Sequence, residues 1–312
     1  MTQPLAPSAL TPAQLAHGGP LPSKCSVLVT GGTGKLGLAT CQALSRHGYE
    51  VRATDQKLPP EFSWSAELGD LKDEFFVHRL VRGVGAVVHL GNHPNAFAGP
   101  SPQRILAENT QMNANVFQAC VQLGVQRLVF ASSVQAFLYT DFNRIGPPYR
   151  MPYLPLDGHA RCAPGPNTYG QSKEFAELML QHLCAAHSRL AATSLRFPML
   201  VGPQLIARFE SLRSFAHGWF NFHECLSHLT FEDAAELIVA CVEREAPGYR
   251  QYFPALAMQL QGRSNADLIA AFYPDTELRQ PRQEMTDLID LSELTRDTGW
   301  QPQRRICVPL ED

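Results

Sequence analysis

Between residues 25 and 197, short apolar segments alternate with longer segments in which apolar positions recur at helical spacing. The short segments have the length and composition of buried strands in a parallel sheet, and the longer ones are typical of amphipathic helices. The predicted strands are 25–30, 50–54, 86–90, 126–131 and 190–197. The predicted helices are 36–47, 71–83, 102–123 and 167–187.

Regular alternation of strand and helix predicts an α/β fold built on a doubly wound parallel sheet. Beyond residue 198 the alternation gives way to mixed segments that include two amphipathic helices, 231–245 and 265–272. We therefore predict a main domain at 24–197. We predict a smaller lobe at 198–312 that returns some elements to the sheet.

Composition narrows the possible partners and compartments of the chain. The first 23 residues contain five prolines, neither lysine nor arginine, and no apolar core of a signal peptide, so we expect residues 1–23 to be a disordered extension. A net charge of −3 argues against a nucleic-acid partner. No apolar stretch approaches the roughly 20 residues of a membrane span, so we predict no membrane partner.

Cysteine and histidine spacing argues against disulfides and metal. The eight cysteines are scattered singly, without a Cys-x-x-Cys pair, which favours a reducing, cytoplasmic setting. His217, His223 and His228 lie in one segment, but no His-x-x-x-His spacing or cysteine-rich context accompanies them. We predict no metal site.

A glycine-rich loop follows the first predicted strand and opens the first predicted helix. Glycine allows a tight turn and a close approach of backbone to a pyrophosphate, while the helix N-terminus offers N–H donors. A purely structural strand-to-helix turn is the alternative. The loop residues that we expect at a dinucleotide cofactor are Gly31, Thr33, Gly34, Lys35, Leu36 and Gly37.

Two aspartates follow strand-like segments and are candidates for contacts with the adenosine half of the cofactor. Asp55 lies 18 residues after Gly37, at the end of the second strand. A carboxylate there accepts hydrogen bonds from ribose hydroxyls and repels a 2′-phosphate, which predicts NAD over NADP. Lys57 softens that preference. Asp70 is expected at the adenine, or alternatively as the N-cap of the helix from Leu71.

Tyr169 and Lys173 are four residues apart on a predicted helix, so their side chains share one face. A lysine ammonium and a positive nicotinamide ring both favour the phenolate of Tyr169, which can then exchange a proton with a substrate hydroxyl while hydride moves. Ser133, at the end of the fourth predicted strand, would hydrogen-bond the same substrate oxygen. Asn109 would close a proton relay, or is an ordinary polar helix position.

These pieces occur in the order found in a known family. The matching motifs are Thr-Gly-Gly-Thr-Gly-Lys-Leu-Gly at 30–37, Gly-Asp-Leu at 69–71, Val-Val-His-Leu-Gly at 87–91, Glu-Asn-Thr at 108–110, Phe-Ala-Ser-Ser at 130–133, Tyr-Gly-Gln-Ser-Lys at 169–173, Leu-Arg-Phe-Pro at 195–198 and Gly-Trp-Gln-Pro at 299–302. As a set they resemble the extended short-chain dehydrogenase/reductase family, also called the NAD-dependent epimerase/dehydratase family.

The resemblance implies a Rossmann-type domain at 24–197 carrying the Ser/Tyr/Lys site, and a lobe at 198–312 that is mostly substrate-binding. It also implies a homodimer packed through the helices near 102–123 and 167–187. Further cofactor contacts that it implies are Leu71, Leu90, Gly91, Asn92, Phe197 and Pro198, with Tyr169 and Lys173 at the nicotinamide.

Departures from the family pattern narrow the chemistry. Dehydratases place an Asp-Glu pair after the catalytic Ser/Thr, whereas Val134 and Gln135 follow Ser133, so sugar dehydration is disfavoured. Nucleotide-sugar epimerases usually carry an asparagine near the position of Met199, which weakens a UDP-sugar assignment. Uronate dehydrogenases follow the serine pair with Asn-His, which this chain also lacks.

We therefore predict an NAD-dependent dehydrogenase or reductase that interconverts a secondary alcohol and a ketone, or a lactol and a lactone, of a sugar-like or ring-bearing molecule. An epimerase that retains NAD is the main alternative, and a non-catalytic NAD sensor is a third hypothesis. Substrate-contact candidates, each with a structural alternative, are His93, Gln135, Met199 and Arg208. The role of the loop at 138–166 as a lid stays open.

Overall fold

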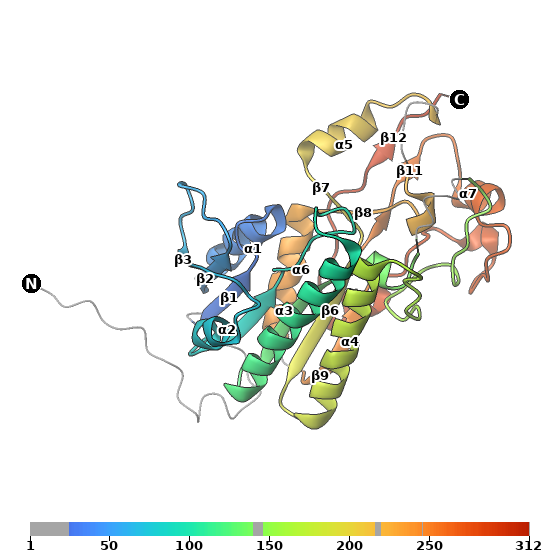
Figure 1. Cartoon of the computed structure of the whole chain (residues 1–312). Helices are drawn as coiled ribbons and strands as arrows, with labels where there is room; N and C mark the ends of the chain where they lie inside the picture. Colours follow the sequence, from blue (N-terminus) through green and yellow to red (C-terminus); the bar gives the residue numbers. More distant parts are fainter. Residues whose placement is uncertain (1–24, 140–145, 216–219, 245, 312) are drawn as a thin grey trace, which may run out of the picture.

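Seven parallel strands form the central sheet (Figure 1). The computed structural model describes residues 25–139, 146–215, 220–244 and 246–311, so the predicted extension at 1–23 lies outside the described residues. The strands are β1 Ser26–Thr30, β2 Glu50–Asp55, β3 Ser65–Leu68, β4 Ala86–His89, β5 Arg127–Ser133, β6 Ala191–Phe197 and β9 Gly248–Tyr252. Their order, β3-β2-β1-β4-β5-β6-β9, is that of a doubly wound sheet and confirms the predicted fold class.

Helices cover both faces of this sheet because its strands are apolar on both sides. Val27 and Val29 point into the core beneath α1 and α6, whereas Leu28 points into the core beneath α2, α3 and α4. This alternation is the two-residue period of a strand buried on both faces. The five helices are α1 Lys35–Arg46, α2 Glu74–Val81, α3 Pro102–Gln122, α4 Thr168–Ala186 and α6 Phe231–Glu243.

Local capping explains where the two long helices begin. Ser101 accepts a hydrogen bond from the backbone N–H of Arg104 at the start of α3, and Pro102 occupies the first turn, where a missing N–H costs nothing. Asn167 accepts from the N–H groups of Tyr169 and Gly170 and so fixes the start of α4. Both helices have nearly the bounds that the sequence predicts.

The start of α2 differs from the sequence prediction. A helix was expected from residue 71, with Asp70 as a possible N-cap, but α2 begins at Glu74. Asp73 is the N-cap and accepts from the N–H groups of Phe75 and Phe76. Asp70 instead accepts from the backbone N–H of Lys72, which holds the preceding residues in a turn.

The chain beyond residue 198 divides its elements between the main sheet and a separate lobe (Figure 1). Strand β9 forms the edge of the main sheet and α6 packs against α1. The lobe has a three-stranded sheet, β10-β8-β7, and a two-stranded sheet, β11-β12. Its elements are β7 Met199–Val201, α5 Pro203–Glu210, β8 Ser227–Thr230, β10 Leu256–Ala257, β11 Gln259–Leu260, α7 Asn265–Phe272 and β12 Cys307–Val308. Helix α8 Ser292–Thr298 instead packs against α6, and its Leu294 lies in the core beneath α1 and α6.

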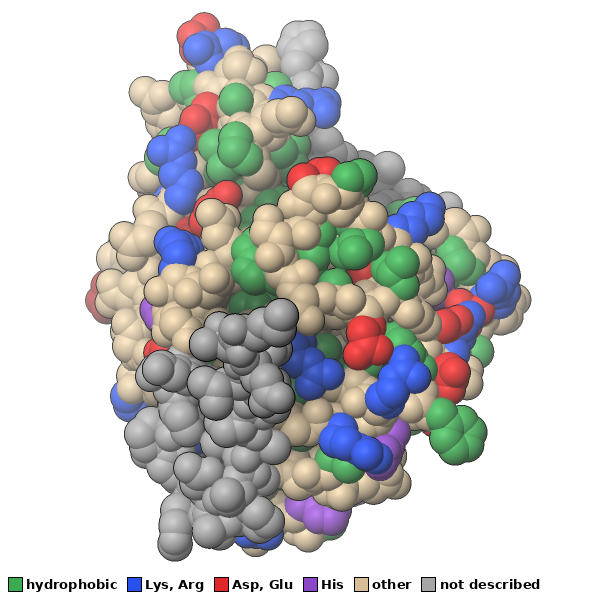
Figure 2. Space-filling view, turned by 90° about the vertical axis from the view of Figure 1, so that its left-hand side faces the viewer, with side chains coloured by type: hydrophobic (Ala, Val, Ile, Leu, Met, Phe, Trp, Pro, Cys, Tyr) green, Lys and Arg blue, Asp and Glu red, His purple; other side chains and the backbone are tan. Residues whose placement is uncertain are grey.

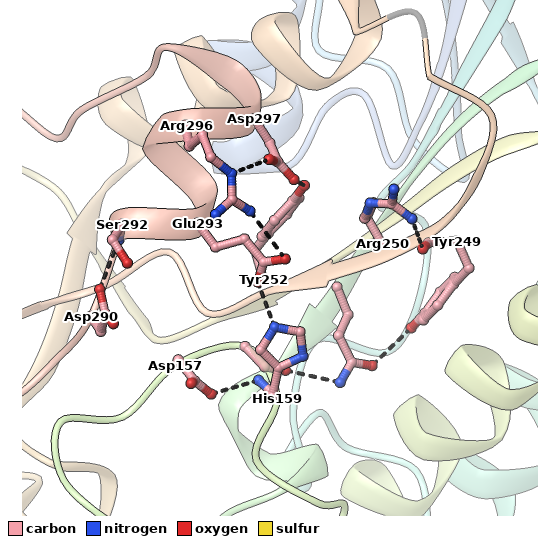
Figure 3. A network of polar contacts seen from close by, with 12 residues as sticks. Asp157, His159, Tyr249, Arg250, Tyr252, Asp290, Ser292, Glu293, Arg296 and Asp297 are labelled. Carbon is pink, nitrogen blue, oxygen red and sulfur yellow. Dashed lines mark hydrogen bonds and ion pairs between the residues drawn. The ribbon is translucent and has the colours of Figure 1, made fainter. Parts of the chain in front are cut away.

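The described part of the loop between β5 and α4 is built into this lobe. Leu154 and Leu156 are fully buried and pair with Leu278 and Ile289 through isolated β-bridges. Farther along the loop, His159 contacts Glu293 of α8 (Figure 3). Residues 151–160 are therefore part of the lobe's core, because their apolar side chains cluster with Ile269 and Tyr273 and their backbone forms these bridges.

A completely buried ion pair joins this loop to the main sheet. Arg196 on β6 and Glu177 on α4 are each 1% exposed and form two hydrogen bonds, of 3.0 and 2.7 Å. Arg196 also donates to the carbonyl oxygens of Gly158 and Ala160. Two desolvated charges are stable here because each is paired and hydrogen-bonded.

We predict that Arg196→Met lowers the free energy of unfolding by about 3–5 kcal/mol, because the Glu177 carboxylate is left buried and unpaired. Urea denaturation measures the change. The double variant Glu177→Leu/Arg196→Met should recover part of the loss.

Arg46→Met is the matched control, since Arg46 pairs with Glu236 on the surface, where about 1 kcal/mol or less is expected. Equal losses in the Arg46 and Arg196 variants would contradict the assigned weight of the buried pair.

Candidate active site

A large cleft opens where the carboxyl ends of the central strands meet. Its volume is about 980 Å³, and its walls come from the glycine loop, the ends of β2, β4, β5 and β6, the inner face of α3 and the start of α4. Strand order reverses beside β1, with β2 on one side and β4 on the other, and ligands of doubly wound sheets bind at such a point. The cleft therefore lies where the fold favours a ligand.

Most predicted site residues line this cleft. They are Gly31, Gly34, Lys35, Leu36, Gly37, Asp55, Leu71, Leu90, Gly91, Asn92, His93, Ser133, Gln135, Tyr169, Lys173, Phe197, Pro198 and Met199. Four predicted residues do not line it, namely Thr33, Asp70, Asn109 and Arg208.

The glycine loop has the geometry of a phosphate cradle. Gly31 has a φ of +68°, and a Cβ there would come within 3.0 Å of the Gly91 backbone. A Cβ on Gly37 would lie 2.2 Å from the Gly31 carbonyl oxygen, so α1 packs closely on the loop. The N-cap of α1 is Gly34, and no side-chain hydrogen bond caps this helix start among the described residues. The N–H groups of the first turn are therefore available to an anion. These features fit a dinucleotide pyrophosphate.

Asp55 is held in place at the end of β2. Its Oδ2 accepts from the backbone N–H of Thr33 at 3.1 Å and from the Thr33 hydroxyl at 2.7 Å. Its Oδ1 accepts from the backbone N–H of Gln56 at 2.7 Å. Thr33 therefore orients Asp55 instead of lining the cleft, and the carboxylate retains lone pairs for hydroxyl donors.

Asp70 is not the N-cap of a helix from Leu71, and its contact with adenine stays a prediction. Its side chain accepts from the backbone N–H of Lys72 at 2.9 Å and lies 3.5 Å from the Lys72 ammonium, so it stabilises a turn outside the cleft. The neighbours Leu71 and Lys72 line the cleft instead. Successive side chains in extended backbone point in opposite directions. The position of Asp70 in the Gly-Asp-Leu motif does not by itself show which of these residues points into the cleft.

Ser133 and Tyr169 meet at the far end of the cleft. A hydrogen bond from Ser133 favours the phenolate, but burial is the larger effect and raises the pKa of Tyr169 to about 12. Glu224 of the lobe adds to the rise through its negative charge. The sequence analysis expected the Lys173 ammonium to lower this pKa, and the structure shows desolvation as the dominant influence instead.

Lys173 is buried beside Tyr169 and has two protein acceptors. Its Nζ donates to the side-chain oxygen of Asn92 and to the carbonyl oxygen of Ala131, both at 2.8 Å. The ammonium also lies 4.7 Å from the ring centroid of Phe130 and 5.5 Å from that of Tyr169. Burial lowers the pKa of Lys173 to about 7, against a smaller rise from Glu177.

Asn109 does not reach the predicted catalytic set. It is fully buried on α3, accepts from the backbone N–H of His93 at 2.8 Å and donates to the Ser172 hydroxyl at 3.1 Å. Asn109 was expected to close a proton relay, whereas the amide that accepts from Lys173 in the structure is that of Asn92. The position of Asn92 just after β4 brings it across the sheet to α4, which helix spacing alone does not predict.

The substrate candidates divide into two groups. His93 lines the cleft but is paired with Glu108 at 2.7 Å, and Met199 lines it from β7. Gln135 lines the cleft between Asn167, whose amide donates to it at 2.8 Å, and the lobe. Arg208 is exposed on the outer side of α5, because the buried Phe209 next to it faces the lobe's core.

Sequence reasoning missed three residues that line the cleft from the part of the chain beyond residue 198. Glu224, His223 and Phe231 line the cleft, and burial lowers the pKa of His223 to about 4. No spacing along the chain marks them as site residues, since they come from a short 3-10 helix and a helix start far from the family motifs. Only tertiary packing brings them to the cleft, where the charge of Glu224 acts on Tyr169.

Several further features bear on ligands and surroundings. Among the described residues, no three His, Cys, Asp or Glu side chains gather in a way that could hold a metal ion. No helix in this part of the chain is both long and apolar enough to cross a bilayer.

On the face shown in Figure 2, which carries α1 and α2, basic side chains are interspersed with acidic ones.

Comparison with known proteins matches this geometry. The profile of the NAD-dependent epimerase/dehydratase family matches residues 27–221. Over 211 residues the chain is 28% identical to an NAD-dependent glucose-6-phosphate dehydrogenase from Haloferax volcanii, covering 64% of this chain and 76% of that relative. Other curated relatives are matched over 33% to 54% of their own length.

Solved structures show the same fold at low identity. A uronate dehydrogenase from Agrobacterium tumefaciens superposes with a TM-score of 0.62 at 20% identity, over 91% of this chain and 86% of that one. A UDP-glucose-4-epimerase from Stenotrophomonas maltophila, with bound NAD and formylated UDP-arabinopyranose, superposes with a TM-score of 0.64 at 19% identity, over 90% and 94%.

The profile match covers more than half of the chain and includes the glycine loop, the serine pair and the Tyr-x-x-x-Lys motif. Fold, cleft and relatives agree on an NAD-dependent dehydrogenase/reductase or epimerase. The chain belongs to the NAD-dependent epimerase/dehydratase family, the extended branch of the short-chain dehydrogenases/reductases.

Proposed function

We propose that this protein is an NAD-dependent dehydrogenase or reductase that interconverts a secondary alcohol and a ketone, or a lactol and a lactone, of a sugar-like or ring-bearing small molecule. The observation that carries the proposal is the meeting of Ser133, Tyr169 and Lys173 in the same cleft as the glycine loop. A proton-transfer group and a dinucleotide cradle in one cleft are what hydride exchange at a carbinol carbon requires.

The chain's own residues supply binding and proton transfer. The glycine loop and the first turn of α1 would hold the pyrophosphate, Asp55 the adenosine ribose, and Lys173 the nicotinamide ribose. Bound NAD would supply the hydride acceptor and, when oxidised, a positive charge near Tyr169.

Tyr169 exchanges the proton of the substrate oxygen, and Ser133 holds that oxygen by a hydrogen bond. A Tyr169 pKa near 12 makes the neutral phenol the resting form, which is the proton donor for ketone reduction. Alcohol oxidation requires the phenolate, which the Ser133 hydrogen bond favours. Burial of Tyr169 at 7% exposure keeps water from competing with the substrate oxygen.

Two observations bear on the alternatives. Val134 and Gln135 follow Ser133, so no acid or base stands there for water elimination. An epimerase that returns the hydride to the opposite face of its intermediate uses the same Ser/Tyr/Lys set. The cleft volume of about 980 Å³ favours keeping that second candidate, because the keto intermediate must turn within the site.

We expect the purified protein to bind NAD reversibly and to form net NADH with neutral aldoses, uronates or cyclic alcohols. Native mass spectrometry before and after NAD addition measures retention, and absorbance at the NADH band measures turnover. If the protein retains NAD firmly, forms no net NADH and interconverts sugar epimers, the proposed dehydrogenase activity is wrong and the protein is an epimerase.

We predict that Tyr169→Phe lowers kcat by about a hundredfold or more while NAD affinity stays within a few-fold, because only the transferable proton is lost. Steady-state kinetics and fluorescence titration measure both quantities. Tyr252→Phe is the matched control, since Tyr252 is also buried but donates its hydroxyl to Asp297, and neither residue lines the cleft. Undiminished turnover in Tyr169→Phe would remove Tyr169 from the proposed role.

We further propose that NAD is preferred over NADP, on the basis of the carboxylate of Asp55. NADH should bind at least about tenfold more tightly than NADPH, since a 2′-phosphate would approach a fixed negative charge. Asp55→Asn should narrow the ratio, whereas Asp70→Asn, outside the cleft, should leave it unchanged. Tighter binding of NADPH than NADH to the unmodified protein would reverse the assignment.

A further inference from the structure

Lys173 is the last member of a buried chain of side-chain hydrogen bonds. Its Nζ donates to Asn92 Oδ1 at 2.8 Å. The amide nitrogen of Asn92 donates in turn to Asn113 Oδ1 at 2.9 Å and to the carbonyl oxygen of Gly91 at 3.0 Å. Asn113 Oδ1 also contacts His89 Nε2 at 2.9 Å, and His89 Nδ1 contacts the Thr30 hydroxyl at 2.7 Å.

The direction of every bond in this chain follows from Lys173. An ammonium only donates, so Asn92 presents its oxygen to Lys173 and its nitrogen to Asn113. Asn113 must then present its oxygen, and His89 must carry its proton on Nε2. The Thr30 hydroxyl donates to the unprotonated Nδ1, and its oxygen accepts from the backbone N–H groups of Leu90 and Gly91 at 3.2 and 3.1 Å.

This assignment is consistent with the surroundings of the chain. Thr30, His89 and Asn113 are fully buried, and burial lowers the pKa of His89 to about 3, so the imidazole is neutral. The rings of Phe117 and Phe130 pack on His89 at 5.8 Å. Asn113 Nδ2 has no partner among the described residues. If the Asn113 amide were rotated by 180°, its NH2 group would face the NH2 group of Asn92, and two donors would meet without an acceptor.

The chain ties together the elements that form the cofactor cradle. Thr30 ends β1, His89 ends β4, Asn113 lies on α3 and Lys173 lies on α4. The backbone of Gly91, which donates to Thr30, lies so close to the glycine loop that a Cβ on Gly31 would come within 3.0 Å of it. The position of the Lys173 ammonium is therefore set by the same contacts that set the loop.

Asn92 contributes a neutral side-chain acceptor to the groups around Lys173, beside the neutral backbone carbonyl of Ala131. On α4, Tyr169 and Glu177 face the ammonium, and Glu177 is neutralised by Arg196. Strand β4 contributes the neutral His89, and β5 contributes the Ala131 carbonyl and the Phe130 ring. The side-chain oxygen of Asn92 accepts from the ammonium without cancelling its charge, which favours the protonated form of a desolvated lysine.

We propose that Asn92 is a positioning residue for the reaction: it holds Lys173 protonated and directed at the nicotinamide ribose, and it does so through Asn113 and His89. The inference rests on the proposed use of a nicotinamide cofactor. It assigns the positioning of Lys173 to the β4–α3 loop, whereas the sequence analysis expected Asn109 on α3 to close a proton relay.

The pH dependence of NADH affinity tests this role without turnover. Protonated Lys173 is the form that donates to ribose hydroxyls, so affinity is lost as pH rises through the pKa of Lys173. Fluorescence titrations from about pH 6 to about pH 10 give the midpoint of that loss. Asn92→Leu removes the acceptor and should lower the midpoint by about one pH unit or more. Asn92→Asp adds a negative charge and should raise it by a similar amount.

Asn265→Leu is the control for loss of a partly buried amide, since Asn265 on α7 donates to the Met285 carbonyl oxygen outside the cleft. Its midpoint should equal that of the unmodified protein, and thermal unfolding checks that each variant is folded. Should Asn92→Leu fail to fold, the upward shift in Asn92→Asp alone carries the test. Midpoints of both Asn92 variants equal to that of Asn265→Leu would overturn the role of Asn92. Absence of NADH binding in the unmodified protein would instead overturn the proposed function.

Discussion

The ion pair between Arg196 and Glu177 is the interaction on which the rest of the site depends. Glu177 lies one helical turn beyond Lys173 on α4, and it also accepts from the hydroxyl of Ser132 at 2.6 Å. Ser132 precedes Ser133 in β5, and Arg196 precedes Phe197 in β6. A single pair of buried charges therefore connects the catalytic helix with the two strands whose ends form the far wall of the cleft.

Because the ion pair is buried, it favours one arrangement of α4, β5 and β6 over others. Inside a protein an unpaired charge is costly, so the arrangement of strands and helix that pairs Arg196 with Glu177 is favoured over arrangements that leave either charge unpaired. The guanidinium also donates to the loop carbonyls of Gly158 and Ala160 and to the sulfur of Cys162, which ties the loop to the main sheet. The lobe that supplies Glu224 to the cleft is thus attached through the same residue that helps position the catalytic set.

The electrostatics of the site follow from how each buried charge is compensated. Glu177 is neutralised by Arg196, whereas Lys173 is surrounded by neutral acceptors, Asn92 and the Ala131 carbonyl. These two hydrogen bonds favour the positive charge of Lys173 without cancelling it, and they oppose the burial that lowers its pKa. The charge stays available to a ligand in a cleft where the effective dielectric is low and each charge acts strongly.

Local spacing along the chain determined the parts of this protein that a single element contains. The glycine loop, Asp55 at the end of a strand, and Tyr169 with Lys173 on one helix face are all visible in the sequence, as is the alternation that dictates a doubly wound sheet. These features can be predicted from the sequence because the hydrophobic period and the turn residues act over only a few positions. Tertiary structure alone decided the contacts between elements: Asn92 with Lys173, Arg196 with Glu177, and the lobe's Glu224 near Tyr169. It likewise turned Asp70, Asn109 and Arg208 away from the cleft, because strand order and helix packing, which no short stretch of sequence encodes, set which distant side chains meet.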